Sequence, residues 1–126
     1  MKSTVFIVED SRTMRSLVRT VLEGDGYEVR ESPDGRQALD ALHSISPDLV
    51  ITDINMPEMD GITLVREIRK LPALRHTPVL ILTTESDPEV KASAQAAGAT
   101  GWIGKPFDPD QLRQVVARVL ERGRAG

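Results

Sequence analysis

Short apolar runs rich in β-branched residues alternate five times with longer amphipathic segments, and this alternation constrains the fold more than any other feature of the sequence. The runs expected to form strands are Thr4–Val8, Tyr27–Glu31, Leu49–Thr52, Val79–Thr83 and Gly101–Gly104. Strands that alternate with helices indicate βαβ units, in which the strands are parallel. Four of the runs are nearly continuous in apolar residues, as is typical of strands covered by helices on both faces.

The segments between the runs carry apolar residues at helical spacing and have recognisable start and stop signals. The helices are expected to begin at Ser11, Pro33, Gly61, Ser86-Asp87-Pro88 and Asp108-Pro109. The first is expected to end at Gly24 and Gly26, the third at Leu71-Pro72 and the fourth at Gly98. Right-handed crossovers then predict a doubly wound α/β fold, whose five-stranded parallel sheet has the order 2-1-3-4-5. Residues 122–126 are expected to form a frayed tail.

Length and composition limit the classes of function that this chain can have. Its 126 residues suit one domain spanning 1–126, and a net charge of −3 with scattered arginines argues against nucleic acid as a partner. The absence of cysteine excludes disulfides and thiolate metal sites. No apolar run is long enough to enter a bilayer or to form a signal peptide, so we expect a cytoplasmic protein.

Charged and hydroxyl side chains gather at the predicted carboxyl ends of the strands. In a doubly wound sheet, ligands bind beyond these ends, where the strand order reverses between strands 1 and 3. Strand 1 is followed by Glu9-Asp10 and strand 3 by Asp53, so three carboxylates are expected in one cleft. They repel unless a cation joins them, and oxygen ligands without histidine or cysteine favour Mg²⁺. Alternatively, Asp10 caps the first helix and Asp53 caps a turn.

The predicted strands 4 and 5 end in Thr83-Thr84 and Lys105, which are expected to face the same cleft. A lysine suits a phosphate or a carboxylate, and a cis Lys105-Pro106 bond would aim it into the cleft. Each residue also has an ordinary interpretation, as a surface lysine or a β-branched strand residue. A carboxylate beside Mg²⁺ and a lysine is a workable nucleophile toward phosphorus, and Asp53 is the central candidate. His43 and His76 are expected on the opposite side or in loops.

These residues together resemble a known protein family. Glu9-Asp10, Asp53 within "DINMPEMDG", Thr83 and Lys105-Pro106-Phe107 are similar to the response-regulator receiver domain of two-component signalling. The resemblance covers essentially the whole chain. The stretches "VEDSRTMRSLVRTVLEGDGYEV" and "AAGATGWIGKPF" look most like the stand-alone chemotaxis receivers of the CheY type. The resemblance implies a flavodoxin-like fold and a signalling domain that assists only its own phosphorylation and dephosphorylation.

The resemblance also implies roles for individual residues. Asp53 would accept a phosphoryl group from a histidine kinase. The expected Mg²⁺ ligands are Glu9, Asp10, Asp53 and the backbone carbonyl of Asn55. The expected phosphate-binding and switch residues are Thr83, Thr84, Lys105 and Trp102, and the expected rate-tuning residues are Asn55 and Glu85. Thr84 stands where a small residue is frequent in the family, which would alter access to Asp53. Trp102 is bulkier than the family's usual aromatic, and its alternative is a partly buried strand residue without a switching role.

Several outputs and two other classes of function stay open at this point. Because the sequence ends soon after the fifth helix, output is expected through protein contact. The expected partners are a CheA-like histidine kinase, the flagellar motor switch protein and a phosphatase, whereas a phosphate sink or a non-chemotactic receiver would look alike. An aspartyl-phosphate phosphatase of the haloacid-dehalogenase type would need a second acid at Asn55. An FMN-binding module would need a phosphate-cradling loop after strand 1, where this chain has acids.

Overall fold

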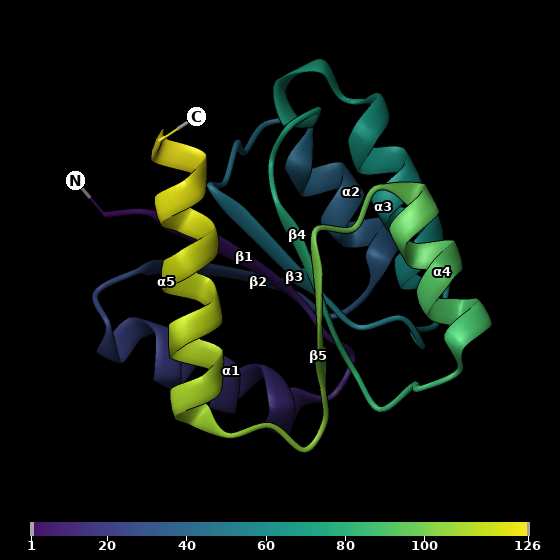
Figure 1. Ribbon diagram of the computed structural model, residues 1–126. Helices are drawn as coiled ribbons and strands as arrows, with labels where there is room; N and C mark the ends of the chain where they lie inside the picture. The colour runs from purple at the N-terminus through teal and green to yellow at the C-terminus, as the bar shows by residue number, and fades with distance from the viewer. Residues whose placement is uncertain (1, 126) are drawn as a thin grey trace.

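Five parallel strands form a single sheet with helices on both faces (Figure 1). The computed structural model describes residues 2–125, with side chains through Arg122. The strands are β1 (Thr4–Val8), β2 (Glu28–Ser32), β3 (Leu49–Thr52), β4 (Val79–Thr83) and β5 (Gly101–Gly104). Their order in the sheet is β2-β1-β3-β4-β5, which confirms the predicted doubly wound topology. The strand order therefore reverses between β1 and β3.

The helices are α1 (Arg12–Gly24), α2 (Gly35–Leu42), α3 (Gly61–Lys70), α4 (Pro88–Ala97) and α5 (Pro109–Ala125), with a 3₁₀ turn at Pro72–Leu74. Side chains cap all five: those of Ser11, Asp34, Asp60, Asp87 and Asp108 accept hydrogen bonds from backbone N–H groups in the first turn. The α5 helix extends through Ala125, into the segment for which the sequence predicts a frayed tail.

Both ends of β2 lie one residue later than the sequence predicts, and α2 starts two residues later, at Gly35. Tyr27 was expected to start β2, but its N–H donates to the Leu22 carbonyl at 3.2 Å and so belongs to the turn that closes α1. The strand begins at Glu28, whose N–H donates to the Ser3 carbonyl. Pro33 does not open α2 directly, because Asp34 follows it as the cap and accepts from the Gln37 N–H at 2.8 Å.

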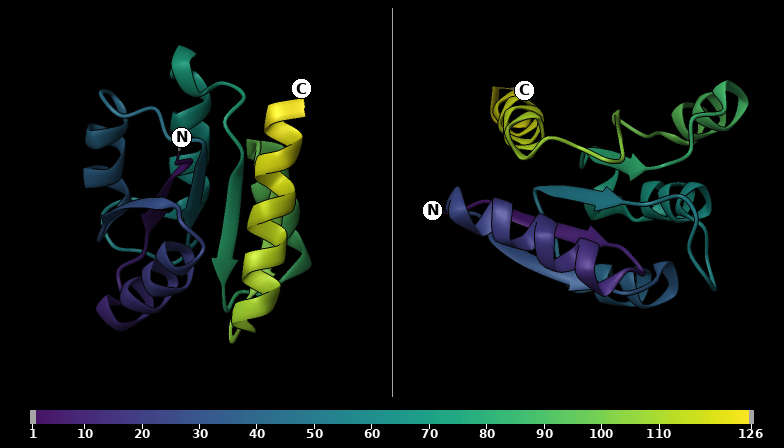
Figure 2. Two further views of the ribbon diagram at one scale, coloured as in Figure 1. Left: turned by 90° about the vertical axis from the view of Figure 1, so that its left-hand side faces the viewer. Right: turned by 90° about the horizontal axis from the view of Figure 1, so that it is seen from below.

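Each face of the sheet has its own hydrophobic core. Helices α1 and α5 cover one face, and α2, α3 and α4 cover the other (Figures 1 and 2). Phe6 and Ile7 show the division, because these neighbours on β1 are both buried but point to opposite cores. Both faces being covered explains why the central strands are continuous in apolar residues. Among the described residues, no helix combines the length and the hydrophobicity that crossing a membrane requires.

Candidate functional site

Three carboxylates meet at the carboxyl edge of the sheet, where the strand order reverses. Glu9 and Asp10 directly follow β1, and Asp53 directly follows β3, the neighbouring strand. A carboxylate oxygen from each of the three lies within 4.8 Å of the others. Glu9 is 4 % exposed and Asp53 is 9 % exposed, whereas Asp10 is open to solvent. The topology thus brings together the three acids that the sequence analysis places in one cleft.

Lys105, which follows β5, places its ammonium group between two of these acids. Its Nζ donates to Oδ2 of Asp53 at 2.8 Å and to Oε1 of Glu9. The Lys105 side chain is only 10 % exposed, so both ion pairs are largely shielded from water. The Lys105–Pro106 peptide bond is cis, as the sequence analysis anticipated. Lys105 is therefore part of the cleft and not an ordinary surface lysine.

The proximity of these charges changes their proton affinities. Burial raises the pKa of Glu9 above its ordinary value of 4.5, and the hydrogen bonds from Lys105 and from the Ser11 N–H oppose that rise only in part. Burial alone would lower the pKa of Lys105. Its hydrogen bonds to Asp53 and Glu9 outweigh this effect, so the pKa of Lys105 lies above the ordinary 10.5. The ammonium therefore stays charged at neutral pH.

The turn between β3 and α3 holds Asp53 in place. The Asp53 N–H donates to the Val8 carbonyl at 3.1 Å, and Oδ1 of Asp53 accepts from the Ile54 N–H at 2.6 Å. Gly61, the first residue of α3, donates its N–H to the Ile54 carbonyl at 2.8 Å. A Cβ at position 61 would lie 2.0 Å from the Asp53 carbonyl oxygen. Only glycine allows the helix to approach the acid so closely.

Hydroxyl and polar residues complete the surroundings of the cleft. Thr83, at the end of β4, is fully buried, and its Oγ1 accepts from the Glu85 N–H at 3.2 Å. The next residue, Thr84, is exposed. The carboxylate of Glu85 accepts from the Ser86 N–H at 3.2 Å and the Asp87 N–H at 3.3 Å, just before α4. Asn55 is exposed in the loop that follows Asp53.

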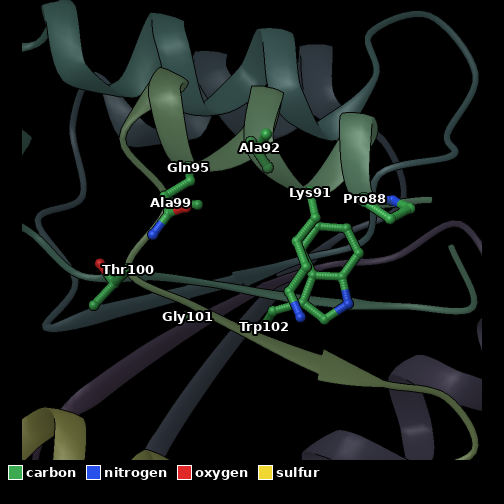
Figure 3. Close-up of a pocket in the computed structure, with 9 residues that line it drawn as sticks. Pro88, Lys91, Ala92, Gln95, Ala99, Thr100, Gly101 and Trp102 are labelled. Atoms are coloured by element: carbon green, nitrogen blue, oxygen red, sulfur yellow. The ribbon is translucent and has the colours of Figure 1, made fainter. Parts of the chain in front are cut away.

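Trp102 lies outside the cleft, in a groove between α4 and β5. The groove has a volume of about 460 Å³, and Figure 3 shows the Trp102 side chain rising from β5 toward α4, beside Lys91. The Lys91 ammonium lies 5.5 Å from the centroid of the indole ring, which is a cation–π contact. The structure therefore places Trp102 in a second region, on β5, three residues before Lys105.

Two further observations concern residues outside the predicted set. His43 ends α2, and His76 lines a cavity of about 280 Å³ with residues that precede β3 and β4, at the opposite edge of the sheet. Neither histidine is in the cleft, as expected. Arg15, which the sequence patterns do not single out, donates from Nη1 to the Glu9 carbonyl at 2.7 Å and to the Asp10 carbonyl at 3.4 Å. The only sequence signal for this contact is that Arg15 lies one helical turn after the cap Ser11, from which its side chain can reach back toward the acid pair.

The donor set of the cleft fits a divalent cation such as Mg²⁺. All three groups offer carboxylate oxygens, which are hard ligands, and they come within 4.8 Å of one another. When all three acids are ionised, the one ammonium of Lys105 leaves two negative charges uncompensated. Asp10 is the exposed member of the set, so the cleft is open to solvent on its side.

Comparison with known proteins identifies the same family over most of the chain. The model of the response regulator receiver domain matches residues 5–117. Chemotaxis protein CheY of Pseudomonas aeruginosa is 38 % identical over 119 residues, which are 94 % of this chain and 96 % of that protein. Sensor histidine kinase TmoS of Ectopseudomonas mendocina is 36 % identical over 122 residues, 97 % of this chain but only 12 % of the kinase. Similar domains thus occur alone and within larger proteins.

Solved structures show the same likeness. Chemotaxis protein CheY4 of Vibrio cholerae superposes with a TM-score of 0.91 at 41 % identity, covering 94 % of this chain and 99 % of that one. The receiver domain of a Pseudomonas aeruginosa sensor histidine kinase, solved with a magnesium ion coordinated in its active site cleft, has a TM-score of 0.89 at 26 % identity and covers 96 % of this chain and 99 % of its own. These likenesses favour the receiver interpretation over a dehalogenase-type phosphatase or a flavin-binding module.

Proposed function

Because the chain belongs to the response-regulator receiver family, a family of signalling domains in two-component systems, we propose that Asp53 is its phosphoryl acceptor. The main support for this assignment is that the Lys105 ammonium bridges Asp53 and Glu9 in a shielded cleft, with Asp10 beside them. An oxygen of the Asp53 carboxylate attacks phosphorus of a phosphohistidine. The new P–O bond forms as the P–N bond breaks, and the leaving imidazole nitrogen takes up a proton.

Asp53 is favoured over Glu9 as the acceptor because of its place in the sheet. Both carboxylates accept two hydrogen bonds, Glu9 from Lys105 and from the Ser11 N–H at 3.1 Å, and Asp53 from Lys105 at 2.8 Å and from the Ile54 N–H at 2.6 Å. Asp53 follows the central strand β3, so that Glu9 and Asp10, which follow the neighbouring strand β1, can remain cation ligands. Lys105 can orient the Asp53 carboxylate before the transfer. After the transfer, its ammonium can form an ion pair with the added phosphoryl oxygens.

The remaining cleft residues hold the cation and the added group. Glu9, Asp10, Asp53 and the backbone carbonyl of Asn55 would hold Mg²⁺, which when bound neutralises charge on the transferring phosphoryl group. Similarity to the magnesium-containing receiver structure supports this assignment. The Thr83 hydroxyl accepts from a backbone N–H in the present structure, so its own proton is available for donation to a phosphoryl oxygen.

We assign regulatory roles to four residues around the cleft and the groove. Thr84, exposed beside buried Thr83, would control access of water and phosphodonors. Asn55 and Glu85 would tune how long the phosphate lasts. Trp102 would read the phosphorylated state, because movement of Thr83 at the end of β4 changes the space next to β5. Partner binding then changes at the surface formed by α4, β5 and α5, and a coupling of about 1–3 kcal/mol is enough for that.

The similarity to chemotaxis proteins favours a cytoplasmic regulator that takes phosphate from a CheA-like kinase and contacts the flagellar motor switch protein and a phosphatase. The alternative outputs are a phosphate sink that competes for the kinase and a non-chemotactic receiver. Binding of the phosphorylated protein to the N-terminal peptide of the motor switch protein separates them. A phosphorylation-dependent gain in peptide affinity supports the motor role, and equal affinity in both states supports the alternatives.

The Asp53→Asn variant tests the acceptor assignment. With Mg²⁺ and acetyl phosphate, the unaltered protein is expected to gain one phosphoryl group by intact-protein mass spectrometry. The variant should gain none, because a neutral amide cannot act as the nucleophile. The matched control is Asp40→Asn, which makes the same change at an exposed position on α2 and should label normally. Labelling of Asp53→Asn at the normal rate would falsify the assignment.

A further inference from the structure

We propose that Arg15 is a positioning residue for the cleft, because its guanidinium holds the turn from which Glu9 and Asp10 project. The inference rests on the proposed function and deepens it, since these two acids are the assigned cation ligands from β1. Arg15 Nη1 donates to the Glu9 carbonyl at 2.7 Å and to the Asp10 carbonyl at 3.4 Å. One cationic group thus contacts the backbone of both residues.

The turn between β1 and α1 is short and needs such a support. Glu9, Asp10 and Ser11 alone connect the end of β1 to the first residue of α1. The Glu9 N–H donates to the Ser32 carbonyl at 3.2 Å, which attaches the start of the turn to β2. The Glu9 and Asp10 carbonyls are outside the strand ladder, and Arg15 supplies their hydrogen-bond donor. Backbone carbonyls without a donor are costly when they are shielded from water.

Arg15 reaches the turn because of its place on the helix. It lies four residues after the cap Ser11, and helical side chains tilt toward the N-terminus of their helix. Its side chain is half-buried, in contrast to the exposed Arg12 in the same turn. A guanidinium presents several donors in one plane, so a single group can serve two neighbouring carbonyls. A lysine would bring the charge but not this planar arrangement.

Two hydrogen bonds to Glu9 fix the turn, one to its side chain and one to its backbone. Oε2 of the Glu9 carboxylate accepts from the Ser11 N–H at 3.1 Å, and the Glu9 backbone carbonyl accepts from Arg15. The carboxylate of Glu9 is therefore oriented by the same turn that Arg15 holds. Loss of Arg15 should leave the acids present but their placement relative to Asp53 less defined.

Loss of the Arg15 side chain should weaken cation binding more than it destabilises the fold. A cation site depends on groups that orient its ligands, and removal of such a supporting group typically weakens metal binding by about 10- to 100-fold. Arg15→Ala should weaken Mg²⁺ binding by about 10-fold, at the lower end of this range, because Arg15 acts through the backbone of the ligands. Phosphodonor labelling should require correspondingly more Mg²⁺ and approach the normal rate when Mg²⁺ is saturating.

The experiment compares Arg15→Ala and Arg15→Lys with the control Arg12→Ala, which removes the same charge from an exposed position in the same helical turn. Mg²⁺ dissociation constants are measured by calorimetry. In the metal-free proteins, hydrogen exchange of the Ser11 amide is measured by NMR. We expect weaker Mg²⁺ binding and faster exchange of the Ser11 amide in Arg15→Ala. Both quantities should be intermediate in Arg15→Lys and normal in Arg12→Ala.

Each outcome decides the proposal. If Arg15→Ala matches Arg12→Ala in Mg²⁺ affinity and in Ser11 exchange, the inference about Arg15 is wrong while the proposed function stands. If the unaltered protein neither binds Mg²⁺ nor labels, the proposed function and this inference fall together. Should Arg15→Ala not fold, Arg15→Lys and Arg15→Gln replace it. Weaker Mg²⁺ binding by Arg15→Gln than by Arg15→Lys then supports the role, and equal, normal affinities overturn it.

Discussion

The acidic cleft and the groove beside α4 lie close together but are built in opposite ways. The cleft is formed by residues that follow β1, β3 and β5, and three of them, Glu9, Asp53 and Lys105, are nearly buried and joined by ion pairs. The groove is lined mainly by small residues of α4 and β5, with one aromatic ring and one lysine. Hydrogen bonds and ion pairs fix Glu9, Asp53 and Lys105, whereas Trp102 packs at the edge of the core and makes a cation–π contact with Lys91.

Substitutions should therefore have different consequences in the two regions. A substitution in the cleft removes a partner from a shielded charge, so its effect spreads to the neighbouring acids. A substitution in the groove alters an open surface, and its effect should stay local. The two regions nevertheless share β5, since Trp102 lies within that strand and Lys105 follows it. The Lys105 N–H also donates to the Thr83 carbonyl at 2.8 Å, which joins the ends of β4 and β5.

Gly61→Ala should break the cleft most severely while leaving the groove intact. The added Cβ would lie 2.0 Å from the Asp53 carbonyl oxygen and 2.9 Å from the Ile54 Cα, and neither backbone atom can rotate away. We expect a loss of more than about 3 kcal/mol in the free energy of unfolding, above the usual cost of overpacking. Urea unfolding and phosphodonor labelling measure the effect, and labelling should be lost.

The matched control for this clash is Gly104→Ala. At Gly104, the last residue of β5, nothing lies within 4 Å of an added Cβ. Its free energy of unfolding should change by less than about 1 kcal/mol, and labelling should continue. Equal effects of the two substitutions would contradict the close approach of α3 to Asp53. Folded Gly61→Ala should keep normal Trp102 emission if the two regions are as independent as their contacts indicate.

Lys105→Met should have the next largest effect, because it removes the cation shared by Glu9 and Asp53. Without Mg²⁺, the variant leaves two shielded acids unpaired, and we expect a loss of about 2–3 kcal/mol in the free energy of unfolding. Added Mg²⁺ should recover part of this loss by neutralising the same acids. The corresponding control is Lys70→Met, which removes an exposed lysine and should change stability by less than about 1 kcal/mol.

The pH dependence of stability provides a second test of the Lys105 ion pairs. The pKa of Lys105 is higher in the folded protein than the ordinary 10.5, so the folded state binds this proton more tightly than the unfolded state does. Its contribution to stability is therefore complete below pH 10.5 and is lost as the pH rises through the folded value. Metal-free Lys105→Met should lack this alkaline loss. An identical alkaline decline in both proteins, measured by urea unfolding, would contradict the ion pairs.

Most of the fold could be predicted because it follows from local patterns. Each strand in the structure corresponds to a predicted apolar run, and the handedness of crossovers determines how parallel strands can be ordered. The start of β2 was placed one residue early, because Tyr27 continues the apolar pattern although its N–H closes the turn after α1. The 3₁₀ turn at Pro72–Leu74 was also not predicted, since three residues are too short to show a period.

The members of the cleft could be predicted, but their mutual contacts could not. Glu9, Asp53 and Lys105 each directly follow a strand, so topology alone brings them to one edge. That Lys105 bridges both acids depends on side-chain conformation, which periodicity does not specify. The same holds for the Thr83 hydroxyl, which accepts from the Glu85 N–H. The contacts of Arg15 could not be predicted either, because they are to backbone carbonyls, and a position one helical turn after Ser11 is only a weak signal for them.

Lys91→Met should give the smallest effect and tests the groove side of the comparison. The substitution removes the ammonium that lies 5.5 Å from the Trp102 ring centroid but keeps an apolar side chain of similar length. We expect a loss of about 0.5–1 kcal/mol in the free energy of unfolding.

Because Trp102 is the only tryptophan of the chain, its fluorescence emission in Lys91→Met should change in intensity and wavelength, whereas the emission in Lys70→Met should not. Unchanged emission in Lys91→Met would contradict the contact. The labelling rate should stay within about twofold of normal, because a contact of this strength confined to the groove cannot alter the barrier at Asp53 much. A labelling rate that changed as strongly as the emission would show that β5 already couples the two regions before phosphorylation.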